Sequence, residues 1–446
     1  MAIFSGVRKW VYPQSIKGTW QKVHRWSALG FHLFLIVTPW IYIGGHPAVR
    51  LDLPDRRLYL LGQIFTATDG LFIALLGLSA AFMLFFVTAL LGRVWCGYIC
   101  PQTVLLEEWV RPIEKFFEGD RSARKRRDAG PWNFDKIWRK FGKWTFFMLA
   151  AFFISMSFSQ WFAGAYEIWT FQAGPVDYAL VGIFTLIWFA DFAWFREQLC
   201  NYVCPYARFQ GALTDKHSLI ISYDATRGEP RKKGKAQGQA GGCIDCNKCV
   251  VVCPQGIDIR DGFQLECISC ARCIDACETV MSRFDHPTLV RYSTEAADTG
   301  ETKGLRLLRP RTLVYAGLLA TLAGALVILL LTHGTIEAQV NRAAGTNFSV
   351  EEGMVRNTFM VRVANNDPRE QQVTYHIAVD GLPDPTVIVN PVTLGPTEAR
   401  TVPLVVRIPE ASAQRSIPFK VTVSSEDESV TLTTTFAGPE GQASGG

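Results

Sequence analysis

Five long apolar runs constrain this chain more than any other feature of its sequence. Each is close to the ~20 residues with which an α-helix crosses the ~30 Å hydrocarbon core of a bilayer. The positive mean hydropathy of +0.13 and the many Phe and Trp residues favour the bilayer over a soluble helical bundle. We therefore predict about five transmembrane helices, at Ala28–Ile43, Leu71–Leu91, Trp144–Phe162, Tyr178–Phe195 and Leu313–Thr332.

Lysine and arginine are distributed unevenly between the loops. Residues 93–143 hold twelve of them and residues 196–311 hold seventeen, whereas residues 163–177 hold none. Because basic loops stay in the cytoplasm, both basic loops and the N-terminus are predicted to be cytoplasmic. Five crossings then place everything after Thr332 on the opposite side. The basic, Gly-rich linker at residues 227–242 is explained by nearby anionic lipid, so no nucleic-acid partner is predicted.

All twelve cysteines fall into four short motifs, and none is left over. A disulfide framework is typical of small secreted domains, so the clustering of cysteines in a long chain favours ligation instead. Two motifs read C-x3-C-P and two are longer runs of four cysteines. Their members are Cys96 and Cys100; Cys200 and Cys204; Cys243, Cys246, Cys249 and Cys253; and Cys267, Cys270, Cys273 and Cys277.

The two longer runs have the C-x2-C-x2-C-x3-C spacing of bacterial two-cluster ferredoxins, in which the fourth cysteine ligates the cluster of the other run. Zinc sites use four ligands with a longer gap between pairs, so zinc is the weaker interpretation. The proline after the first run is present, and Glu278 replaces the second. The spacing predicts two 4Fe–4S clusters that move single electrons, although purely structural clusters stay an alternative. The predicted ligands are Cys243, Cys246, Cys249 and Cys277 for one cluster, and Cys267, Cys270, Cys273 and Cys253 for the other.

The C-x3-C-P motifs form an internal repeat, RVWCGYICPQTVL and EQLCNYVCPYARF, and each copy follows a predicted span. Residues four apart are neighbours on a helix, so each pair is predicted to place both thiols on one helix face. Pro101 and Pro205 then open the helix. Four thiols at one membrane surface suit copper, another metal or cluster, or a dithiol–disulfide couple, and buried structural cysteines are the alternative. Cys96, Cys100, Cys200 and Cys204 are therefore the candidate catalytic and metal-binding residues.

The region after about Ala338 changes character. It consists of short alternating runs separated by Gly, Pro, Asn and Asp, which is typical of an immunoglobulin-like sandwich. The predicted strands lie at Thr358–Val363, Val373–Val379, Val387–Val389, Arg400–Ile408, Phe419–Val423 and Val430–Phe436.

Together these patterns predict a multi-domain membrane protein in four parts. Residues 1–210 form a helical membrane domain with both C-x3-C-P motifs, and residues 211–310 form a ferredoxin-like cytoplasmic domain with two clusters. Residues 311–333 are the fifth transmembrane helix, and residues 334–446 are an all-β immunoglobulin-like domain. His24 and His32 lie in or near the first apolar run, where a histidine is either functional or satisfied by a neighbouring helix.

The stretches WCGYICPQ and CNYVCPYARFQ, both ferredoxin-type runs, the last span and the outer tail together resemble the cytochrome c oxidase accessory proteins, the CcoG/FixG/RdxA family. The resemblance covers nearly the whole chain. It implies a bacterial inner-membrane protein with cytoplasmic clusters and a periplasmic tail, which helps to build a cbb-type oxidase by reducing Cu(II) to Cu(I). Cys96, Cys100, Cys200 and Cys204 would handle the copper, and the clusters would supply the electrons. The implied partners are copper ions, a copper chaperone or oxidase assembly factors, and an electron donor of unknown identity; a homodimer is compatible with the family.

Two other functions stay open at this point. The chain also resembles the membrane ferredoxin of periplasmic nitrate reduction, which implies an electron carrier between the quinol pool and a partner. That family usually lacks the large outer tail. The second alternative is an assembly scaffold without enzymatic turnover, in which the tail binds the partner.

Overall fold

The computed structural model describes residues 10–54, 56–65, 70–231, 242–301, 304, 306–332, 336–365, 372–395, 398–426 and 428–439. Most of the predicted basic linker, residues 232–241, lies outside these ranges. The chain forms two compact units. The first comprises the described residues within Met1–Trp40 and Gly70–Val327, and the second those within Ile41–Asp69 and Ile328–Gly446. All twelve cysteines belong to the first unit.

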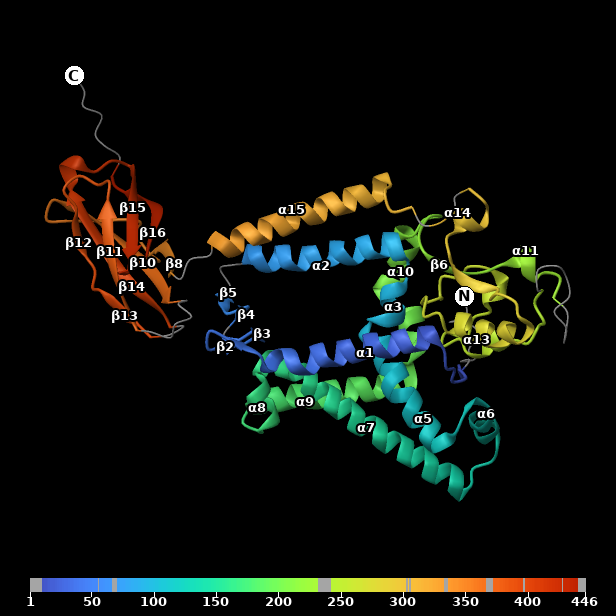
Figure 1. Cartoon of the computed structure of the whole chain (residues 1–446). Coiled ribbons are helices and arrows are strands. Elements are labelled where there is room, and N and C mark those ends of the chain that lie inside the picture. The colour runs from blue at the N-terminus through green and yellow to red at the C-terminus, as the bar shows by residue number, and fades with distance from the viewer. Residues whose placement is uncertain are drawn as a thin grey trace. The chain divides into compact units, whose positions relative to one another are not determined.

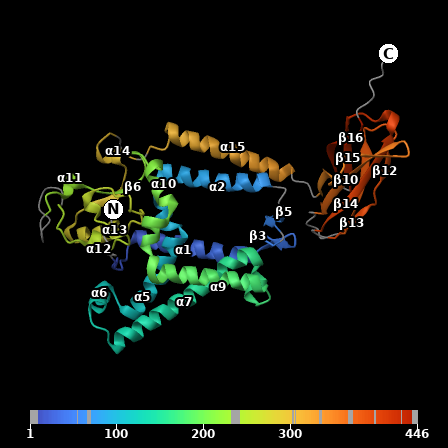
Figure 2. The same cartoon turned by 180° about the vertical axis from the view of Figure 1, so that it is seen from behind.

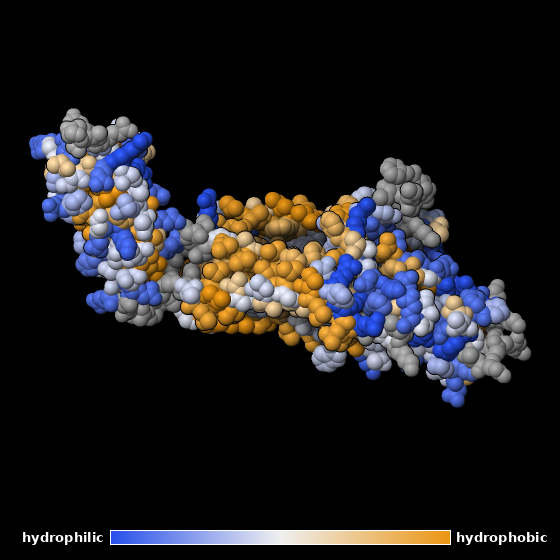
Figure 3. Space-filling view, turned by 90° about the horizontal axis from the view of Figure 1, so that it is seen from above, coloured by the Kyte–Doolittle hydropathy of each residue, from blue (hydrophilic) through white to orange (hydrophobic). Residues whose placement is uncertain are grey.

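Four helices in the described part of the chain are long and apolar enough to cross a membrane, and they match four of the predicted runs. They are Gly70–Leu91 (α2), Phe134–Ala163 (α7), Pro175–Phe195 and Pro310–Thr332 (α15). The third of them consists of α9, Pro175–Ala190, and the π-helical turn η4, Asp191–Phe195. Helices α7 and α9 pack against each other, and α2 and α15 run side by side (Figures 1 and 2). Apolar side chains cover the long helices in Figure 3.

The first predicted run is shifted relative to the helix that contains it. Helix α1 spans Thr19–Val37 and is followed by a 3-10 turn, η1, at Thr38–Trp40. The prediction of Ala28–Ile43 therefore misses the first nine helical residues, and Tyr42–Ile43 form a short strand, β1. Pro39, which lacks an N–H group, lies where the α-helix gives way to η1. A membrane crossing by α1 stays a prediction.

Helix α1 begins before the predicted run because a carboxylate from a distant part of the sequence caps its amino end. Asp275 Oδ1 accepts a hydrogen bond from Trp20 N at 3.1 Å, and Asp275 Oδ2 accepts one from Gln21 N at 2.8 Å. Gly18 leaves room for this carboxylate, since a Cβ at Gly18 would lie 2.2 Å from Asp275 Cγ. The cap supplies acceptors for two otherwise unpaired N–H groups of the first turn. No local sequence signal reveals a cap that is 255 residues away.

Short helices connect the long ones. The π-helical turns η3 and η5 occur here beside η4, and such turns are found frequently at functional sites. The bounds are Val94–Tyr98 (α3), Pro101–Leu105 (α4), Leu106–Val110 (η3), Arg111–Glu118 (α5), Arg121–Ala129 (α6), Ala165–Trp169 (α8), Leu199–Val203 (η5) and Pro205–Leu213 (α10).

The cysteine-rich part of the first unit lies between α10 and α15 in the sequence. Its two strands, Ile220–Tyr223 (β6) and Val290–Ser293 (β7), pair antiparallel, and its apolar core includes Ile221, Ile259 and Ile274. In Figure 1 this part lies at the end of the long helices where α3 and α10 are found. Its helices are Ala225–Gly228 (α11), Lys248–Val251 (α12), Ile259–Asp261 (η6), Arg272–Met281 (α13), Ser282–Phe284 (η7) and Glu295–Asp298 (α14).

The second unit contains the predicted β-sandwich. One antiparallel sheet has the order β12-β14-β10-β8, with β9 on β10, and the other has the order β13-β11-β15-β16. Phe359 and Phe419, from different sheets, meet edge to face in the core at 5.4 Å between ring centroids. The bounds are Ile336–Arg342 (β8), Ser349–Glu351 (β9), Met354–Asn365 (β10), Val373–Asp380 (β11), Thr386–Ile388 (β12), Val392–Leu394 (β13), Ala399–Pro409 (β14), Glu410–Ser412 (η8), Ser416–Ser424 (β15) and Ser429–Ala437 (β16).

Six of these strands coincide with predicted ones, whereas β8, β9 and β13 were not predicted. The same unit includes small sheets from the segment after α1, which were also not predicted. Their strands are β1, His46–Pro47 (β2), Val49–Asp52 (β3), Arg57–Leu60 (β4) and Gln63–Phe65 (β5).

Candidate iron–sulfur and thiol sites

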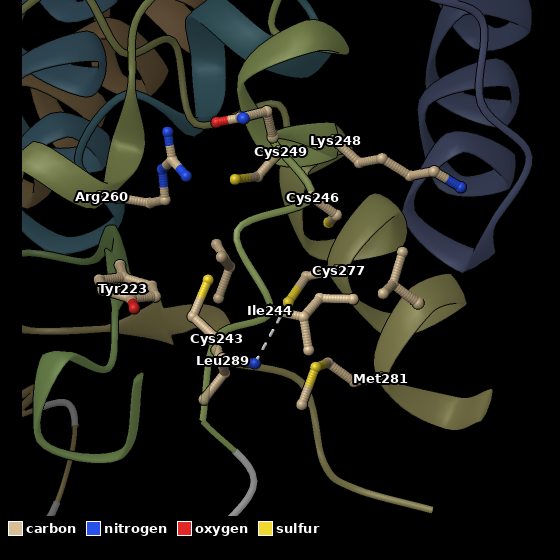
Figure 4. A pocket seen from close by; sticks show the side chains of 13 residues that line it. Tyr223, Cys243, Ile244, Cys246, Lys248, Cys249, Arg260, Cys277, Met281 and Leu289 are labelled. Carbon is tan, nitrogen blue, oxygen red and sulfur yellow. Dashed lines mark hydrogen bonds between the residues drawn. The ribbon is translucent and has the colours of Figure 1, made fainter. Parts of the chain in front are cut away.

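The cysteines of the two longer runs surround two cavities. The first cavity, of about 400 Å³, is lined by three cysteines of the first run and by Cys277 from α13, together with Tyr223 and Arg260 (Figure 4). The first-run cysteines are Cys243, Cys246 and Cys249. The structure thus brings Cys277, the last cysteine of the second run, to the sulfurs of the first run.

The second cavity, of about 350 Å³, has the reciprocal arrangement. Its wall includes the other three cysteines of the second run, Cys267, Cys270 and Cys273, and also Cys253 from the first run. Cys249 reaches this wall as well. Two adjacent cavities with sulfurs from two chain segments suit cubane clusters, for which thiolates are the usual ligands.

A single metal ion is a poorer fit to either cavity. Within the described ranges, which include the four C-x3-C-P thiols, no three Cys, His, Asp or Glu side chains converge closely enough to hold one ion. Zinc requires such convergence, because it is bound at ~2.0–2.3 Å by each of its ligands. Cavities of about 400 and 350 Å³, each lined by at least four cysteines, have room for a larger cluster.

Both runs bend in the same way. Asp245 and Ser269, each two residues after the first cysteine of its run, have positive φ, and so do Asn247 and Ala271, which follow the second cysteines. A left-handed backbone conformation is uncommon for residues other than glycine. Because it recurs at equivalent positions, the two runs have the same loop conformation. The two runs therefore wrap their cavities with similar turns.

Backbone N–H groups contact the sulfurs. Leu289 N donates to Cys277 Sγ at 3.4 Å (Figure 4, dashed line), and the backbone of Gln255, Gly256 and Ile257 donates to Cys253. Burial raises the pKa of the Cys253 thiol, and these hydrogen bonds oppose the rise. Such bonds stabilise a thiolate and, in a cluster, help to set the reduction potential.

Each cavity has one arginine in its wall that sequence analysis did not single out. Arg260, at the first cavity, pairs with Asp245 at 2.7 Å and with Asp258 at 2.6 Å. Arg272, at the second, pairs with Glu107 on η3. Arg272 directly precedes Cys273, so its place in the run was an available signal. Nothing in the local sequence of Glu107 indicated this role.

The C-x3-C-P motifs depart from the predicted helix face. Cys96 lies in α3, which ends at Tyr98, whereas Cys100 is the N-cap residue of α4, which begins with Pro101. The second copy repeats the break, because Cys204 caps α10. Proline is favoured in the first turn of a helix and pushes the residue before it out of helical conformation. The proline therefore starts a new helix, and the prediction of one continuous helix face was wrong.

This break gives Cys100 donors that a helix interior would not offer. The backbone N–H groups of Gln102 and Thr103, at the open amino end of α4, lie near its sulfur and act to lower its pKa, although neither makes a capping hydrogen bond to it. Burial raises the pKa of Cys100, and these two donors counteract it. A helix amino end stabilises a thiolate, so this position suits a metal-binding or redox-active sulfur.

The structure brings the four C-x3-C-P thiols into one neighbourhood. Burial, followed by the neighbouring Cys100, raises the pKa of Cys96 to about 12. Burial also raises the pKa of Cys200, and the other three cysteines add to that rise. Gln210 of α10 donates to Cys96 Sγ at 3.5 Å and so links the two copies of the motif.

The thiol site touches the second cavity through the backbone. A Cβ added to Gly97 would lie 2.6 Å from Ile268 O and 3.0 Å from Cys270 N. Only glycine permits this approach, so α3 packs directly on the loop that carries Cys270. Arg93 also links these parts of the molecule. Its guanidinium donates to Leu265 O, just before the second run, and to Ala207 O of α10.

A hydrogen-bonded pair of tyrosines runs beside this contact. Tyr98 and Tyr292 have their hydroxyl oxygens 3.1 Å apart, and Tyr292 donates to Ser269 O at 2.6 Å. Tyr98 is buried, and Ser27 of α1 donates to its carbonyl oxygen at 2.9 Å. The pair fills the space between the first C-x3-C-P motif and the second run.

The two histidines of α1 have different surroundings. His32 is satisfied on both ring nitrogens, because Nδ1 lies 2.7 Å from Ala28 O and Nε2 accepts from Trp109 at 2.7 Å. This favours the packing interpretation for His32. His24 is buried, and its Nδ1 lies 3.4 Å from Glu108 Oε1. Glu108 and Trp109 are consecutive residues of η3, so this turn reaches both histidines.

Three regions of the chain match described protein families. Residues 195–295 match the "4Fe-4S dicluster domain", and residues 73–118, which include Cys96 and Cys100, match the "4Fe-4S binding domain". Residues 326–439 match the "IG-like fold at C-terminal of FixG". The chain therefore carries 4Fe–4S domains, and its β-sandwich is immunoglobulin-like.

Several curated proteins are similar over most of the chain. Nitrogen fixation protein FixG of Rhizobium meliloti is 36% identical over 85% of this chain and 81% of its own length. Protein RdxA of Cereibacter sphaeroides is 34% identical over 83% of this chain and 82% of its own length. Ferredoxin-type protein NapH of Haemophilus influenzae is 27% identical, over 48% of this chain and 70% of its own. The chain belongs to the FixG/RdxA family of membrane-bound iron–sulfur electron-transfer proteins.

Proposed function

We propose that this protein delivers single electrons from two 4Fe–4S clusters to the four C-x3-C-P thiols, where Cu(II) is reduced to Cu(I). The contact between Gly97 and the loop of Cys270 carries this proposal. At Gly97 the contact leaves no room for even a methyl group between the thiol-bearing helix α3 and the loop of Cys270. The bound clusters would supply electrons one at a time.

The proposed cluster ligands follow the two cavities. One cluster would be held by Cys243, Cys246, Cys249 and Cys277, and the other by Cys253, Cys267, Cys270 and Cys273. Arg260 and Arg272 place one positive charge beside each cavity. A nearby cation stabilises the reduced, more negative form of a cluster, which raises its reduction potential.

At the thiol site, copper would be the substrate. Thiols lose their protons when sulfur binds a metal, and soft sulfur ligands prefer Cu(I) to Cu(II). A bound Cu(II) ion would accept one electron and become Cu(I), while the donating cluster is oxidised by one electron. The cell context that we propose is the bacterial inner membrane, with the clusters in the cytoplasm and the sandwich in the periplasm. A copper chaperone or the assembly factors of a cbb-type oxidase would receive the product.

One observation favours a second candidate. The match of residues 73–118 to a "4Fe-4S binding domain" includes Cys96 and Cys100, so a further cluster at the four thiols competes with copper. In that case the chain would be an electron carrier, fed for example from the quinol pool. The partial similarity to ferredoxin-type protein NapH fits this alternative.

Metal analysis and turnover distinguish the two candidates. Protein purified without oxygen is expected to hold about eight iron atoms per chain, as two 4Fe–4S clusters require. After chemical reduction it should convert Cu(II) to Cu(I), as measured with a Cu(I)-specific chelator. The variant with Cys96, Cys100, Cys200 and Cys204 all changed to Ser should retain this iron and lose the activity. About twelve iron atoms in the parent and four fewer in the variant would instead establish the third cluster and contradict copper reduction at the thiols.

A further inference from the structure

Helix α7 is longer than a bilayer crossing requires. It has 30 residues, Phe134–Ala163. At ~1.5 Å per residue it measures about 45 Å, compared with a hydrocarbon core of ~30 Å. Its amino-terminal third must therefore lie in the interfacial layer or tilt along it. In Figures 1 and 2 this end of α7 lies beside α6.

In that amino-terminal third, apolar side chains are exposed and charged side chains are buried, which is the opposite of a helix that faces water. Its aromatic residues point outward, with Phe134 82% exposed and Trp138 and Phe141 each 62% exposed. Its lysines point inward, with Lys136 5% exposed and Lys143 7% exposed. A helix at a protein–water boundary buries its apolar face and exposes its charges.

The inward charges are all used to hold neighbouring helices. Lys143 Nζ lies 2.9 Å from Glu118 Oε1 of α5. Lys140 Nζ lies 3.0 Å from the same oxygen and 2.6 Å from Asp128 Oδ1 of α6. Lys136 Nζ donates to Gly130 O at 2.8 Å. These contacts fix the direction of the helix, so its aromatic face cannot turn inward without leaving buried charges unpaired.

The exposed aromatic face continues without interruption into the membrane-spanning part of α7. Trp144, Leu149 and Phe152, at helical spacing from Phe141, are 47%, 57% and 44% exposed. Lipid covers such side chains within the bilayer. The exposed side chains of the amino-terminal third and those of the membrane-spanning part lie on the same face of α7. We therefore infer that the lipid that covers the membrane-spanning part also covers the amino-terminal third.

Helix α6 adds cations at this end of α7. Lys125 and Arg126 are exposed, and no ion pair joins either of them within the ranges that the structure describes. Aromatic rings and basic side chains together are typical of the membrane interface, where lysine and arginine attract anionic lipids. Trp132, 69% exposed, lies between the two helices in sequence.

We propose that residues 116–144, the interfacial elbow, bind the headgroup layer of anionic phospholipids in the surrounding leaflet. Lys125 and Arg126 would bind lipid phosphates, and the rings of Trp132, Trp138 and Phe141 lie at headgroup depth. The occupant of this surface is lipid and not a second protein. This inference does not depend on the identity of the electron acceptor.

Photocrosslinking tests which molecule covers the elbow. The full-length protein, with benzoylphenylalanine in place of Trp138, is reconstituted in vesicles of phosphatidylcholine and phosphatidylglycerol and irradiated. Mass spectrometry should find a phospholipid adduct at residue 138. The control is the same replacement at Phe284, an aromatic residue of η7 that is 39% exposed and should give no lipid adduct. A crosslink from residue 138 to another protein chain, or the absence of lipid adducts there, would overturn the proposal.

Charge removal tests the preference for anionic headgroups. Phosphatidylglycerol is titrated into the detergent-solubilised protein, and bound lipid is counted by native mass spectrometry. Each cation near an anionic surface contributes about fivefold, so Lys125→Gln with Arg126→Gln should weaken binding roughly 25-fold. The matched control removes two exposed cations elsewhere, by Arg283→Gln with Lys420→Gln, and should bind like the parent. Equal affinities in both variants, or equal binding of phosphatidylcholine by the parent, would contradict the proposal.

Discussion

Arg272 and Glu107 form a buried ion pair between the second cavity and the π-helical turn η3. The side chains are 12% and 7% exposed. Burial alone would raise the pKa of Glu107, but Arg272 and then Arg111 lower it further than burial raises it. The carboxylate is therefore ionised, and it neutralises part of the charge that Arg272 brings to the cavity wall.

The first prediction concerns the two arginines at the cavities. Replacing Arg272 with Gln should lower the reduction potential of the second cluster and leave the first nearly unchanged. A charge ~8 Å away at an effective dielectric constant of ~20 contributes about 2 kcal/mol, which corresponds to on the order of 90 mV for one electron. Potentiometric titration followed by electron paramagnetic resonance measures both potentials. Arg260→Gln is the reciprocal control, and equal shifts of both clusters in either variant would show that the arginines do not act locally.

The second prediction concerns the contact at Gly97. Replacing Gly97 with Ala forces α3 away from the loop of Cys270, because the new Cβ would lie 2.6 Å from Ile268 O. Overpacking of this kind costs about 1–3 kcal/mol, and the larger separation should slow Cu(I) formation several-fold at unchanged iron content. Gly77→Ala in α2 is the control, since a Cβ there meets nothing within 4 Å. Identical rates for the two variants would show that electrons reach the thiols by another route.

The third prediction concerns acid. Burial would raise the pKa of Glu114, but Arg196, Arg111 and Arg124 lower it to about 2 from its ordinary 4.5. A carboxyl with a depressed pKa stabilises the fold above its unfolded-state pKa, and this stability is lost as the pH falls from 4.5 toward 2. The loss is on the order of 3 kcal/mol. Thermal midpoints from circular dichroism of the detergent-solubilised protein should fall across this range.

Two variants check that assignment. Glu114→Gln leaves buried arginines without their partner, so it should be less stable at pH 6, with a flatter dependence below pH 4.5. Glu410→Gln, which removes an exposed carboxyl of η8, should follow the parental curve. A parental curve from Glu114→Gln would assign the acid sensitivity to other groups.

The fourth prediction concerns the cap on α1. Replacing Asp275 with Ala removes both acceptors for Trp20 N and Gln21 N, and loss of an N-cap costs about 0.5–2 kcal/mol. Amide hydrogen exchange should accelerate at these two residues and at their helical neighbours. Asp275→Asn keeps one acceptor oxygen and should give an intermediate result. Unchanged exchange in Asp275→Ala would mean that other contacts hold the first turn.

The sequence predicted well those features that short-range pattern determines. The grouping of Cys253 and Cys277 with the opposite runs came from the spacing of two-cluster ferredoxins, and the cysteines line the two cavities in that grouping, while cluster ligation stays a prediction. Alternation located strands such as β10 and β14 within a few residues. Strands β9 and β13, of three residues each, were missed, although β12, which is equally short, was predicted.

Features that depend on distant contacts were not predictable. The start of α1 depends on Asp275, and the contact of α3 with the second run depends on Gly97, whose neighbours are more than 170 residues away in sequence. The helix break at Pro101 was partly predictable. The proline was recognised as opening the helix, but the start of a new helix immediately after Cys100 was not, so the cysteines were placed on one continuous face.

The cap of α1 also has a consequence for the order of biogenesis. The ribosome makes α1 near the start of synthesis, and Asp275, between Cys273 and Cys277, emerges 255 residues after Trp20. The first turn of α1 therefore waits, uncapped, until the cysteine-rich segment has been translated and folded.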